Sequence, residues 1–573
     1  MIHLIIDGQN IEVPEGTTIL EAAKQADIHI PTLCYHEDQN VKAVCRICVV
    51  EVEGMKNLAA SCSTPVSEGM VVQTASPKVL NARKHLLELI FARHPQNCLV
   101  CAKSGKCELQ KVAQDLNMHE EIRYDTTLRS QKKDASSPSI IRDPQKCIVC
   151  CRCLETCNEI QAINTLSKEN RGFHTLVAPA YGQKLADTCC VNCGQCYQVC
   201  PTGAITIHDD TDKVREQKLK GKILAIQVAP SVRINLAEAI GEDPGTVSTG
   251  RLVTALKRLG FDWVFDSDFS ADLTIMEEGT ELLNRIKNGG TLPMFTSCCP
   301  AWVKYCETYL PDYTDHLSTA KSPQQIFGPV IKTYFAKKQG INPADICSMS
   351  VMPCTAKKFE CQRPEFNSSG YQDVDISITV QELANMIRAG GIDFSKLPDT
   401  PFDQPFGLGS GAGLIFGATG GVMEAALRTV YAVVMGKEMD DIEYTPVRGF
   451  EAIKEAEVDL NGLKVKIAVA HGMKNARKLI DEIRAGERDY HFVEVMACPG
   501  GCIGGGGSAL RTWNKMEKRK AAVYEEERKL PIRLSHKNPA ITQIYEEFLG
   551  EPCGEMSHHL LHTRYFNRED LLK

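Results

Sequence analysis

The sequence predicts a multi-domain protein that combines α+β and α/β folds. A length of 573 residues, at roughly 150 residues per domain, corresponds to about four domains. The 26 cysteines fall into clusters over the first third of the chain and at three later sites. After about residue 210, apolar strand patterns alternate with helical patterns, which is typical of an α/β domain. The net charge of −7 argues against nucleic acid as a main partner.

The N-terminus indicates the compartment. MIHLIIDGQN lacks the basic and apolar regions of a signal peptide, so a cytoplasmic protein is expected. Because disulfides are rare in the reducing cytosol, closely spaced cysteines there are expected to bind metal. The longest uncharged stretch, 405–423, contains seven glycines and is expected to be closely packed interior and not a membrane span.

The first predicted domain, residues 1–78, is a β-grasp fold of the ferredoxin type. Apolar and polar residues alternate on both sides of Asp7-Gly8, which predicts a hairpin. Thr18 and Glu21 have the spacing of a capping box, for a helix that ends near Ala26. Four cysteines follow and could hold a [2Fe-2S] cluster, with a structural zinc ion as the alternative: Cys34, Cys45, Cys48 and Cys62.

The second predicted domain, residues 79–126, is helical with a cysteine-bearing loop. Cys98, Cys101 and Cys107 provide only three thiolates, and His94 precedes them at the spacing H-x3-C. One imidazole and three thiolates would complete a [4Fe-4S] site. The alternative is that His94 is a solvated loop residue. The polar run 130–139 is predicted to be a linker.

The third predicted domain, residues 138–209, contains C-x2-C-x2-C-x3-C twice, an internal repeat typical of a two-cluster [4Fe-4S] ferredoxin. In that arrangement the fourth cysteine of each run binds the other cluster. Cys151 and Cys189 are out of phase and are not expected to bind. One predicted cluster therefore takes Cys147, Cys150, Cys153 and Cys200, and the other takes Cys157, Cys190, Cys193 and Cys196.

Three motifs stand out in the large predicted α/β domain, residues 210–515: TSCCPAW (296–302), MPCTAKKFE (352–360) and EVMACPGGC (494–502). Together with the four accessory patterns in the same order, they closely resemble the [FeFe]-hydrogenases over nearly the whole chain. The resemblance implies an H-cluster, in which a [4Fe-4S] cluster is bridged to a diiron subsite with CO, cyanide and a dithiolate amine. It implies Cys299, Cys354, Cys498 and Cys502 as ligands, with Cys502 as the bridge.

The resemblance also implies the residues around the diiron subsite. Lys357 matches the family's hydrogen-bond donor to one cyanide, a buried anion that requires such donors. The other matching pocket positions are Ala229, Pro230, Ser231 and Gln324. Met352, Met496 and Phe416 would pack around the carbonyl groups, and the alternative for each is an ordinary core residue.

A proton route is implied as well. Cys298 matches the family residue that exchanges protons with the bridging amine. Glu278, Glu281 and Arg285 fall at i, i+3 and i+7, on one helical face. By the resemblance, that face could relay protons, with Ser318 bridging the two carboxylates. The alternative, favoured by the i, i+3, i+7 spacing alone, is a surface face of ion pairs.

Some parts of the sequence depart from the family or have no assigned role. The family commonly has a GGGQP-like run after the last ligand, but here Ser508 and Ala509 follow four glycines (504–507), so the packing of this loop is open. The last segment, 516–573, is predicted to be a polar helical tail like a small subunit. Four cysteines are expected to be buried apolar residues: Cys306, Cys347, Cys361 and Cys553.

The resemblance implies reversible conversion of H2 to protons and electrons, with four accessory clusters as the electron path. RHPQNCLVC and GKCELQ are similar to the cluster-bearing subunit of NADH dehydrogenases. This favours the hydrogen-activating subunit of an electron-bifurcating complex, with ferredoxin, flavin- and NAD-binding and small [2Fe-2S] partner subunits. A formate-dehydrogenase-linked complex is another partner. NAD chemistry needs another chain, since no GxGxxG follows a strand. The diiron subsite needs maturation proteins.

Three other functions remain as alternatives. A stand-alone ferredoxin hydrogenase would use the same catalytic domain. An inactive iron–sulfur assembly or relay protein would have no reason to keep Cys298, Lys357 and Glu278, all of which are present. A hydrogen sensor would need a signalling module, which these residues do not show.

Overall fold

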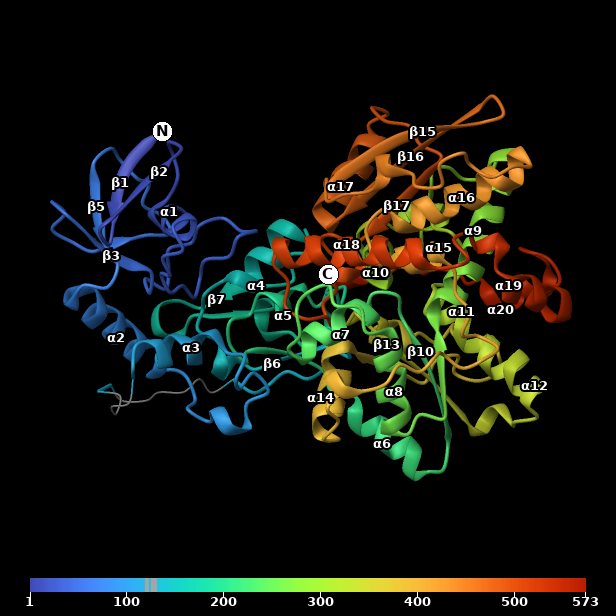
Figure 1. The fold of residues 1–573 in the computed structure, drawn as a ribbon, viewed down its shortest axis with the longest axis horizontal. Helices are drawn as coiled ribbons and strands as arrows, with labels where there is room; N and C mark the ends of the chain where they lie inside the picture. Colours follow the sequence, from blue (N-terminus) through green and yellow to red (C-terminus); the bar gives the residue numbers. More distant parts are fainter. Residues whose placement is uncertain (119–122, 125–130, 573) are drawn as a thin grey trace. The chain divides into compact units, whose positions relative to one another are not determined.

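The computed structural model describes residues 1–118, 123–124 and 131–572 (Figure 1). The predicted boundary at residue 126 and the start of the predicted linker at Ser130 lie outside the described residues. The chain forms two compact units. The first contains Met1–Glu159, Asn164–Leu185 and Val199–Thr206, and the second contains Ile160–Ile163, Ala186–Gln198 and the chain from Ile207 onward. In the described part of the chain, no helix combines the length and the apolar composition that crossing a membrane requires.

A five-stranded sheet opens the first unit, in the order β2-β1-β5-β3-β4. β1 and β2 form the predicted antiparallel hairpin through Asp7-Gly8, and β1 pairs in parallel with β5. Helix α1 begins with the predicted capping box, in which the Glu21 carboxylate accepts from Thr18 N–H at 3.0 Å. The hairpin and helix predictions are confirmed. The elements are β1 (Ile2–Ile6), β2 (Gln9–Val13), α1 (Ile19–Gln25), β3 (Val49–Val52), β4 (Ala59–Ala60) and β5 (Met70–Gln73).

Short elements carry the cysteine loops that follow. Helix α2 begins at the N-cap Ser76, whose side chain accepts from Val79 N–H, and proline occupies the first helical turn. Two small two-stranded sheets, β6-β9 and β7-β8, lie in the region of the two predicted ferredoxin cysteine runs, 147–157 and 190–200. The elements are α2 (Pro77–Phe91), α3 (Glu108–Asp115), β6 (Ile140–Arg142), α4 (Arg152–Glu155), β7 (Ser167–Glu169), β8 (Leu176–Ala178) and β9 (Ile205–Ile207).

The second unit contains two four-stranded sheets. The order of the first is β11-β10-β13-β14, and all its pairs are parallel. Its central strands are apolar and buried, as expected when helices cover both faces of a parallel sheet. In Figure 1, β10 and β13 lie side by side within this unit. The strands are β10 (Ile223–Val228), β11 (Trp263–Asp266), β13 (Ile346–Met352) and β14 (Ile376–Thr379).

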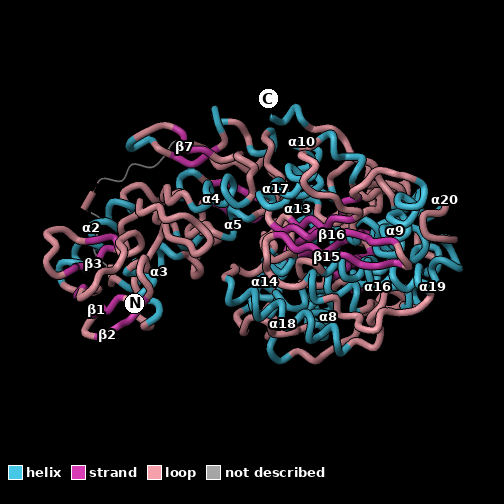
Figure 2. Tube along the Cα trace, turned by 90° about the horizontal axis from the view of Figure 1, so that it is seen from above, coloured by secondary structure: helices cyan, strands magenta, loops and turns pink. Residues whose placement is uncertain are grey.

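The second sheet has the order β12-β17-β16-β15, with β12, β17 and β16 mutually parallel and β15 an antiparallel edge. Figure 2 shows β15 and β16 side by side. Exposed and buried residues alternate along part of β15, which suits an edge strand with one solvated face. β17 is buried throughout. The strands are β12 (Met294–Phe295), β15 (Ile453–Leu460), β16 (Leu463–His471) and β17 (Phe492–Met496).

Helices cover these sheets. The longest, α9, runs over Ser267–Asn288 and ends at Gly289 in the left-handed region, where glycine has no steric penalty. The other helices of the unit are α5 (Gln195–Gln198), α6 (Thr211–Leu219), α7 (Val232–Ile240), α8 (Thr249–Leu259), α10 (Pro300–Tyr309), α11 (Pro323–Val330), α12 (Ala336–Gln339), α13 (Ala356–Cys361), α14 (Val380–Ala389), α15 (Gly411–Leu414), α16 (Gly421–Met435), α17 (Met473–Arg484), α18 (Trp513–Lys529), α19 (Pro539–Ile544) and α20 (Glu555–Leu561).

The C-terminal segment is helical, as predicted, but buried carboxylates also anchor it. Asp272 on α9 accepts from Ser535 Oγ at 2.7 Å and from Asn538 Nδ2 at 2.9 Å. Glu307 on α10 accepts from Arg568 Nε at 2.8 Å and from Phe566 N–H at 3.0 Å. These contacts attach the segment to the core of the second unit.

Candidate active site and cluster-binding loops

The predicted catalytic residues follow the carboxyl ends of strands from both sheets of the second unit. β10 leads into Ala229–Ser231, and β13 leads into Cys354. β12 is followed by Cys298 and Cys299, and β17 by Cys498. Parallel sheets bind ligands outside the carboxyl ends of their strands, where the connecting loops meet. The strand topology therefore explains why motifs nearly 200 residues apart in sequence converge.

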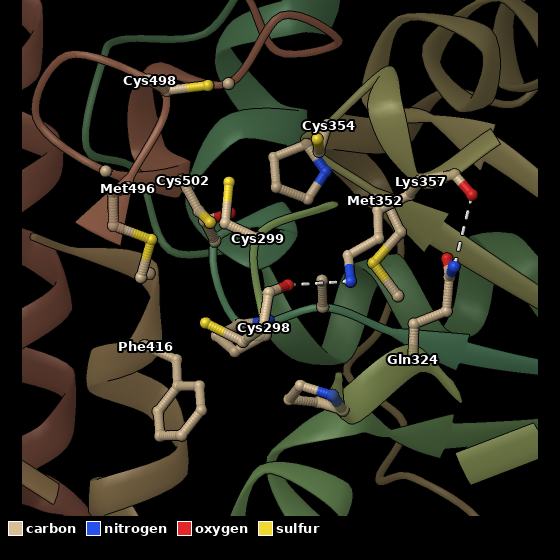
Figure 3. Close-up of a pocket in the computed structure, with 18 of the residues that line it drawn as sticks. Cys298, Cys299, Gln324, Met352, Cys354, Lys357, Phe416, Met496, Cys498 and Cys502 are labelled. Atoms are coloured by element: carbon tan, nitrogen blue, oxygen red, sulfur yellow. Dashed lines mark hydrogen bonds between the residues drawn. The ribbon is translucent and has the colours of Figure 1, made fainter. Parts of the chain in front are cut away.

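One pocket collects these loops (Figure 3). Its lining includes every residue predicted for the cluster and its immediate surroundings: Ala229, Pro230, Ser231, Cys298, Cys299, Gln324, Met352, Cys354, Lys357, Phe416, Met496, Cys498 and Cys502. Sequence reasoning missed several small or cyclic residues in the same lining. Most adjoin a predicted residue in the chain, which is the one indication that could have found them: Ser267, Ala271, Pro300, Pro323, Pro353, Ala497, Gly417, Gly501 and Gly505.

The Lys357 ammonium is fixed at the pocket wall by two acceptors. It donates to the Cys298 carbonyl at 3.1 Å (Figure 3). It also donates to Glu360 Oε2 at 2.9 Å. Burial opposes the charge of Lys357, but the Glu360 carboxylate outweighs burial and raises the pKa of Lys357. Gln324 Nε2 donates to the same Glu360 oxygen at 2.9 Å. Glu360 was missed although it lies three residues after Lys357 in a quoted motif.

Glu494 is a second missed residue, at the start of the last motif. It is fully buried, and its carboxylate accepts from Gly420 N–H at 2.7 Å and from Met423 N–H at 2.8 Å. These bonds hold the start of α16, directly after the turn that carries Phe416. Glu494 thereby connects strand β17, which leads to Cys498 and Cys502, to the glycine-rich stretch.

The predicted proton-relay residues extend along α9 from the pocket. Glu278 is fully buried, which excludes a simple surface ion-pair face. Burial and the charge of Glu281 raise the pKa of Glu278 to about 8, and the Ser318 hydroxyl opposes the rise. Ser318 Oγ donates to Glu281 Oε2 at 2.8 Å, and Arg285 donates to Glu281 Oε1 at 2.7 Å.

The four predicted ligands of one ferredoxin-like cluster line a second pocket, in the first unit: Cys147, Cys150, Cys153 and Cys200. For the other cluster, Cys157 belongs to the first unit, whereas Cys190, Cys193 and Cys196 belong to the second. Cys151 Sγ and Cys189 Sγ each lie 3.5 Å from a backbone carbonyl, as suits thiols that donate weak hydrogen bonds.

In the N-terminal region, the cysteines of the first predicted ligand group lie in two close pairs, and His94 of the second group is oriented by a backbone carbonyl. Cys48 Sγ lies 3.4 Å from Cys62 Sγ, and the side chains of Cys34 and Cys45 hydrogen-bond. His94 is buried, and its Nδ1 lies 3.0 Å from the Pro95 carbonyl. Donation from Nδ1 to that carbonyl fixes the tautomer with the lone pair on Nε2, the form that binds metal.

The remaining cysteines follow the prediction with one correction. Cys306, Cys347 and Cys361 are buried. Cys553 is only half-buried, and its Sγ lies 3.4 Å from the Glu277 carbonyl. The prediction that Cys553 is buried is therefore wrong.

Known protein families match most of the chain. The family described as "Iron only hydrogenase large subunit, C-terminal domain" matches residues 222–506, and "Iron hydrogenase small subunit" matches 514–568. Toward the N-terminus, a "2Fe-2S iron-sulfur cluster binding domain" matches residues 1–77. The "NADH-ubiquinone oxidoreductase-G iron-sulfur binding region" matches 83–121, and a "4Fe-4S binding domain" matches 187–206.

Individual relatives agree with these matches. The chain is 51% identical to the NADP-reducing hydrogenase subunit HndD of Solidesulfovibrio fructosivorans, over 100% of both chains. It is 39% identical to iron hydrogenase 1 of Clostridium pasteurianum, over 99% of this chain and 100% of the relative. A solved apo [FeFe]-hydrogenase from Chlamydomonas reinhardtii, 40% identical, superposes with a TM-score of 0.57 over 63% of this chain and 99% of that one.

Full-length identity above one half, together with the matches to the catalytic and accessory domains, identifies an enzyme with an H-cluster domain and with 2Fe-2S and 4Fe-4S binding domains. The chain belongs to the iron-only, or [FeFe], hydrogenase family.

Proposed function

We propose that the chain catalyses H2 ⇌ 2H⁺ + 2e⁻ at an H-cluster in the pocket of the second unit. The observation that carries this proposal is the convergence of four cysteines, Cys298 and Lys357 on one pocket at the carboxyl ends of two sheets. A purely electron-carrying site needs the four thiolates but neither Cys298 nor a buried ammonium.

The lining fits the group. Four thiolates are the ligand set of a [4Fe-4S] cluster, and the thioethers of Met352 and Met496 provide soft, polarisable packing. When bound, the H-cluster supplies a metal position that accepts hydride and an amine that accepts the proton. Cys299, Cys354, Cys498 and Cys502 would hold the [4Fe-4S] part of the H-cluster, here called the catalytic cubane, and Cys502 would also contact the diiron subsite.

Lys357 would hold one cyanide. An ammonium has three donors, and the Cys298 carbonyl and Glu360 use two of them. The third is available for an anionic ligand in the pocket. Because a buried anion without a donor is costly, this bond would contribute to both retention and orientation of the diiron subsite.

The chain's own groups would move the proton. Cys298 would exchange it with the bound amine, and Glu278 would receive it from Cys298. Ser318, whose Oγ donates to Glu281 at 2.8 Å, would pass the proton from Glu278 to Glu281, and Arg285 binds the Glu281 carboxylate. A carboxyl group with a pKa of about 8 can both donate and accept a proton near neutral pH.

We propose four accessory clusters as the electron path, in the domains 1–78, 79–126 and 138–209. A [2Fe-2S] cluster would use Cys34, Cys45, Cys48 and Cys62, and a [4Fe-4S] cluster would use His94, Cys98, Cys101 and Cys107. The two remaining [4Fe-4S] clusters would use Cys147, Cys150, Cys153 and Cys200, and Cys157, Cys190, Cys193 and Cys196.

The electron partner is proposed to be another chain. A relative named as a subunit of an NADP-reducing hydrogenase and the region similar to NADH-ubiquinone oxidoreductase support a hetero-oligomer. We propose flavin- and NAD(P)-binding and small [2Fe-2S] subunits, with ferredoxin as a second carrier and maturation proteins for the diiron subsite. Purification from the native host tests this: an isolated monomer that reduces ferredoxin alone would contradict it.

Infrared spectroscopy of the matured protein tests the catalytic proposal. Carbonyl and cyanide bands, together with an iron count that includes the diiron subsite, are expected. A fully matured preparation with four thiolate-bound irons in the pocket but no such bands would contradict the proposal, as would zinc at the same cysteines.

A further inference from the structure

The loop of Cys190, Cys193 and Cys196 contacts the loops that carry the pocket cysteines, all within the second unit. Thr355, directly after Cys354, donates from its Oγ1 to the Asn192 carbonyl at 2.7 Å. Asn192 directly precedes Cys193. A single hydrogen bond thus joins the backbone next to a predicted accessory ligand to the residue next to a predicted catalytic ligand.

Glycines allow this approach. A Cβ on Gly194 would lie 2.4 Å from Thr355 Oγ1, and a Cβ on Gly506 would lie 2.3 Å from the Cys193 carbonyl oxygen. On the other side, a Cβ on Gly505 would lie 2.3 Å from the Pro353 carbonyl. Glycine is the one residue that fits such close backbone contacts. The four-glycine run therefore lies between the Cys193 loop and the Cys354 loop.

Two buried glutamine side chains fasten the same contact. Gln195 Nε2 donates to the Gly504 carbonyl at 3.0 Å, and Gln198 Nε2 donates to the Gly505 carbonyl at 3.1 Å. Gln198 Oε1 also accepts from Arg511 N–H at 3.1 Å. Because buried amides are costly when unpaired, these bonds fix the spacing of the two loops. The Ser508 carbonyl also accepts from Gln198 at 3.2 Å, which holds the chain directly after Gly507.

We infer that the Thr355 hydroxyl is the coupling contact through which electrons pass between the Cys193-bound cluster and the catalytic cubane, and that Gly194 and Gly506 set its length. This inference rests on the proposed function. The path follows covalent bonds from Cys193 to the Asn192 carbonyl, crosses one hydrogen bond, and continues through Thr355 to Cys354. It contains no van der Waals gap, across which electronic coupling falls steeply.

Each passage transfers one electron. The accessory cluster loses one electron and is oxidised, while the catalytic cubane gains it and is reduced; no bond to the protein forms or breaks. Two passages in this direction supply the electrons for one H2, and two in the reverse direction remove them. Thr355 is a positioning residue, because it would act through its contact with Asn192 and its bond to Cys354, and not on the substrate itself.

The test uses the full chain prepared without the diiron subsite, so that no hydrogen chemistry contributes. Reduced methyl viologen is mixed with the protein, and rapid freeze-quench EPR follows reduction of the accessory clusters and then of the catalytic cubane. Thr355→Ala removes the hydroxyl without added bulk, and Thr355→Ser restores it. The matched control is Thr308→Ala on α10, which also removes a buried hydroxyl that donates to a backbone carbonyl, at 2.7 Å.

A several-fold slower reduction of the cubane is expected in Thr355→Ala, with wild-type rates in Thr355→Ser and Thr308→Ala. The spin–spin splitting between the reduced clusters reports their separation and should not change in these three variants. A wild-type rate in Thr355→Ala with unchanged splitting would overturn the inference.

A second variant keeps the inference testable if Thr355→Ala loses the catalytic cubane. Gly506→Ala should push the loops apart, weaken the spin–spin splitting and slow the same step; weakened splitting with an unchanged rate would also overturn the inference. Missing carbonyl and cyanide bands in the matured wild type would defeat the proposed function instead, so the two failures are distinguishable.

Discussion

The proposed ligands in the pocket are less exposed than the cysteines near His94: Cys299 and Cys502 are half-buried like Cys101 and Cys107, but the remaining members of the two groups differ. Cys354 and Cys498 are buried at the ends of strands, and Met352 and Met496 pack beside them. Cys98 is exposed, and Leu99 beside it is 99% exposed. The ligand chemistry proposed for both places would thus be used once in a largely buried pocket and once nearer the surface.

The difference in exposure agrees with the species that each region is proposed to exchange: protons and hydride in the pocket, and electrons at the His94 site. Proton and hydride chemistry gains from a site that excludes water, because electrostatic interactions are stronger there and side reactions are fewer. Electron exchange with another protein needs a cluster near the surface. Burial in the pocket and exposure in the His94 loop therefore match the two proposed tasks.

The largest effect is expected from the loss of Cys298, a residue that a site which only carries electrons would not need. Cys298→Ala should lower H2 turnover by about 10²-fold or more, because general acid–base transfer contributes on that scale. The carbonyl and cyanide bands should remain. The matched control is Cys306→Ala, another buried cysteine, on α10. Equal turnover in the two variants, measured by gas chromatography of H2, would remove Cys298 from the proton route.

The next effect concerns pH. Because the pKa of Glu278 is raised to about 8, its carboxyl holds a proton at neutral pH and loses it as the pH rises through 8. H2 production should therefore fall above pH 8. Glu278→Gln should be slower at every pH and should lack this step. The measurement is the rate of H2 production from pH 6 to 10. If Glu278→Gln showed the same fall above pH 8 as the wild type, a group other than Glu278 would cause it.

A smaller effect on the chemistry of the pocket is expected when the proposed cluster site of His94, Cys98, Cys101 and Cys107 is disrupted. His94→Ala should remove one ligand and with it an accessory cluster, which an iron count and EPR would detect. H2/D2O exchange, which needs no external electrons, should stay at the wild-type level. The control is His85→Ala on α2, a histidine outside the predicted ligand set. Loss of exchange would mean that the two regions depend on each other.

The smallest effect concerns stability. Leu99→Ser should change the free energy of unfolding by less than about 0.5 kcal/mol, because an exposed side chain away from packed features contributes little. Met496→Ala, in contrast, should cost about 2–5 kcal/mol, the usual range for a buried methionine. Thermal unfolding of both variants provides the measurement. A large effect of Leu99→Ser would contradict the exposed position of this loop.

Local patterns predicted much of this molecule. The hairpin through Asp7-Gly8 and the capping box of Thr18 and Glu21 depend on neighbours a few residues apart, and both are present. The pocket lining was predicted from motifs that match a family. Spacing alone favoured an ion-pair face for Glu278, which the structure buries completely.

Glu494 could not be predicted because it binds amides 71 and 74 residues away, and nothing in its local sequence distinguishes it from a solvated carboxylate. Glu360 is different, because it lies three residues after Lys357 at the spacing of a helical ion pair. Only its contact with Gln324, on another helix, depends on the tertiary structure.

Ligand spacing and apolar periodicity are local properties, so they were enough to predict which side chains could bind iron and where many strands and helices would form. The convergence of four cysteines from two sheets on one pocket, and the contact of Thr355 with Asn192 across a glycine pair, became visible in the folded chain alone. Strand order and close backbone contact arise from packing between segments far apart in the chain, and no short window of sequence specifies them.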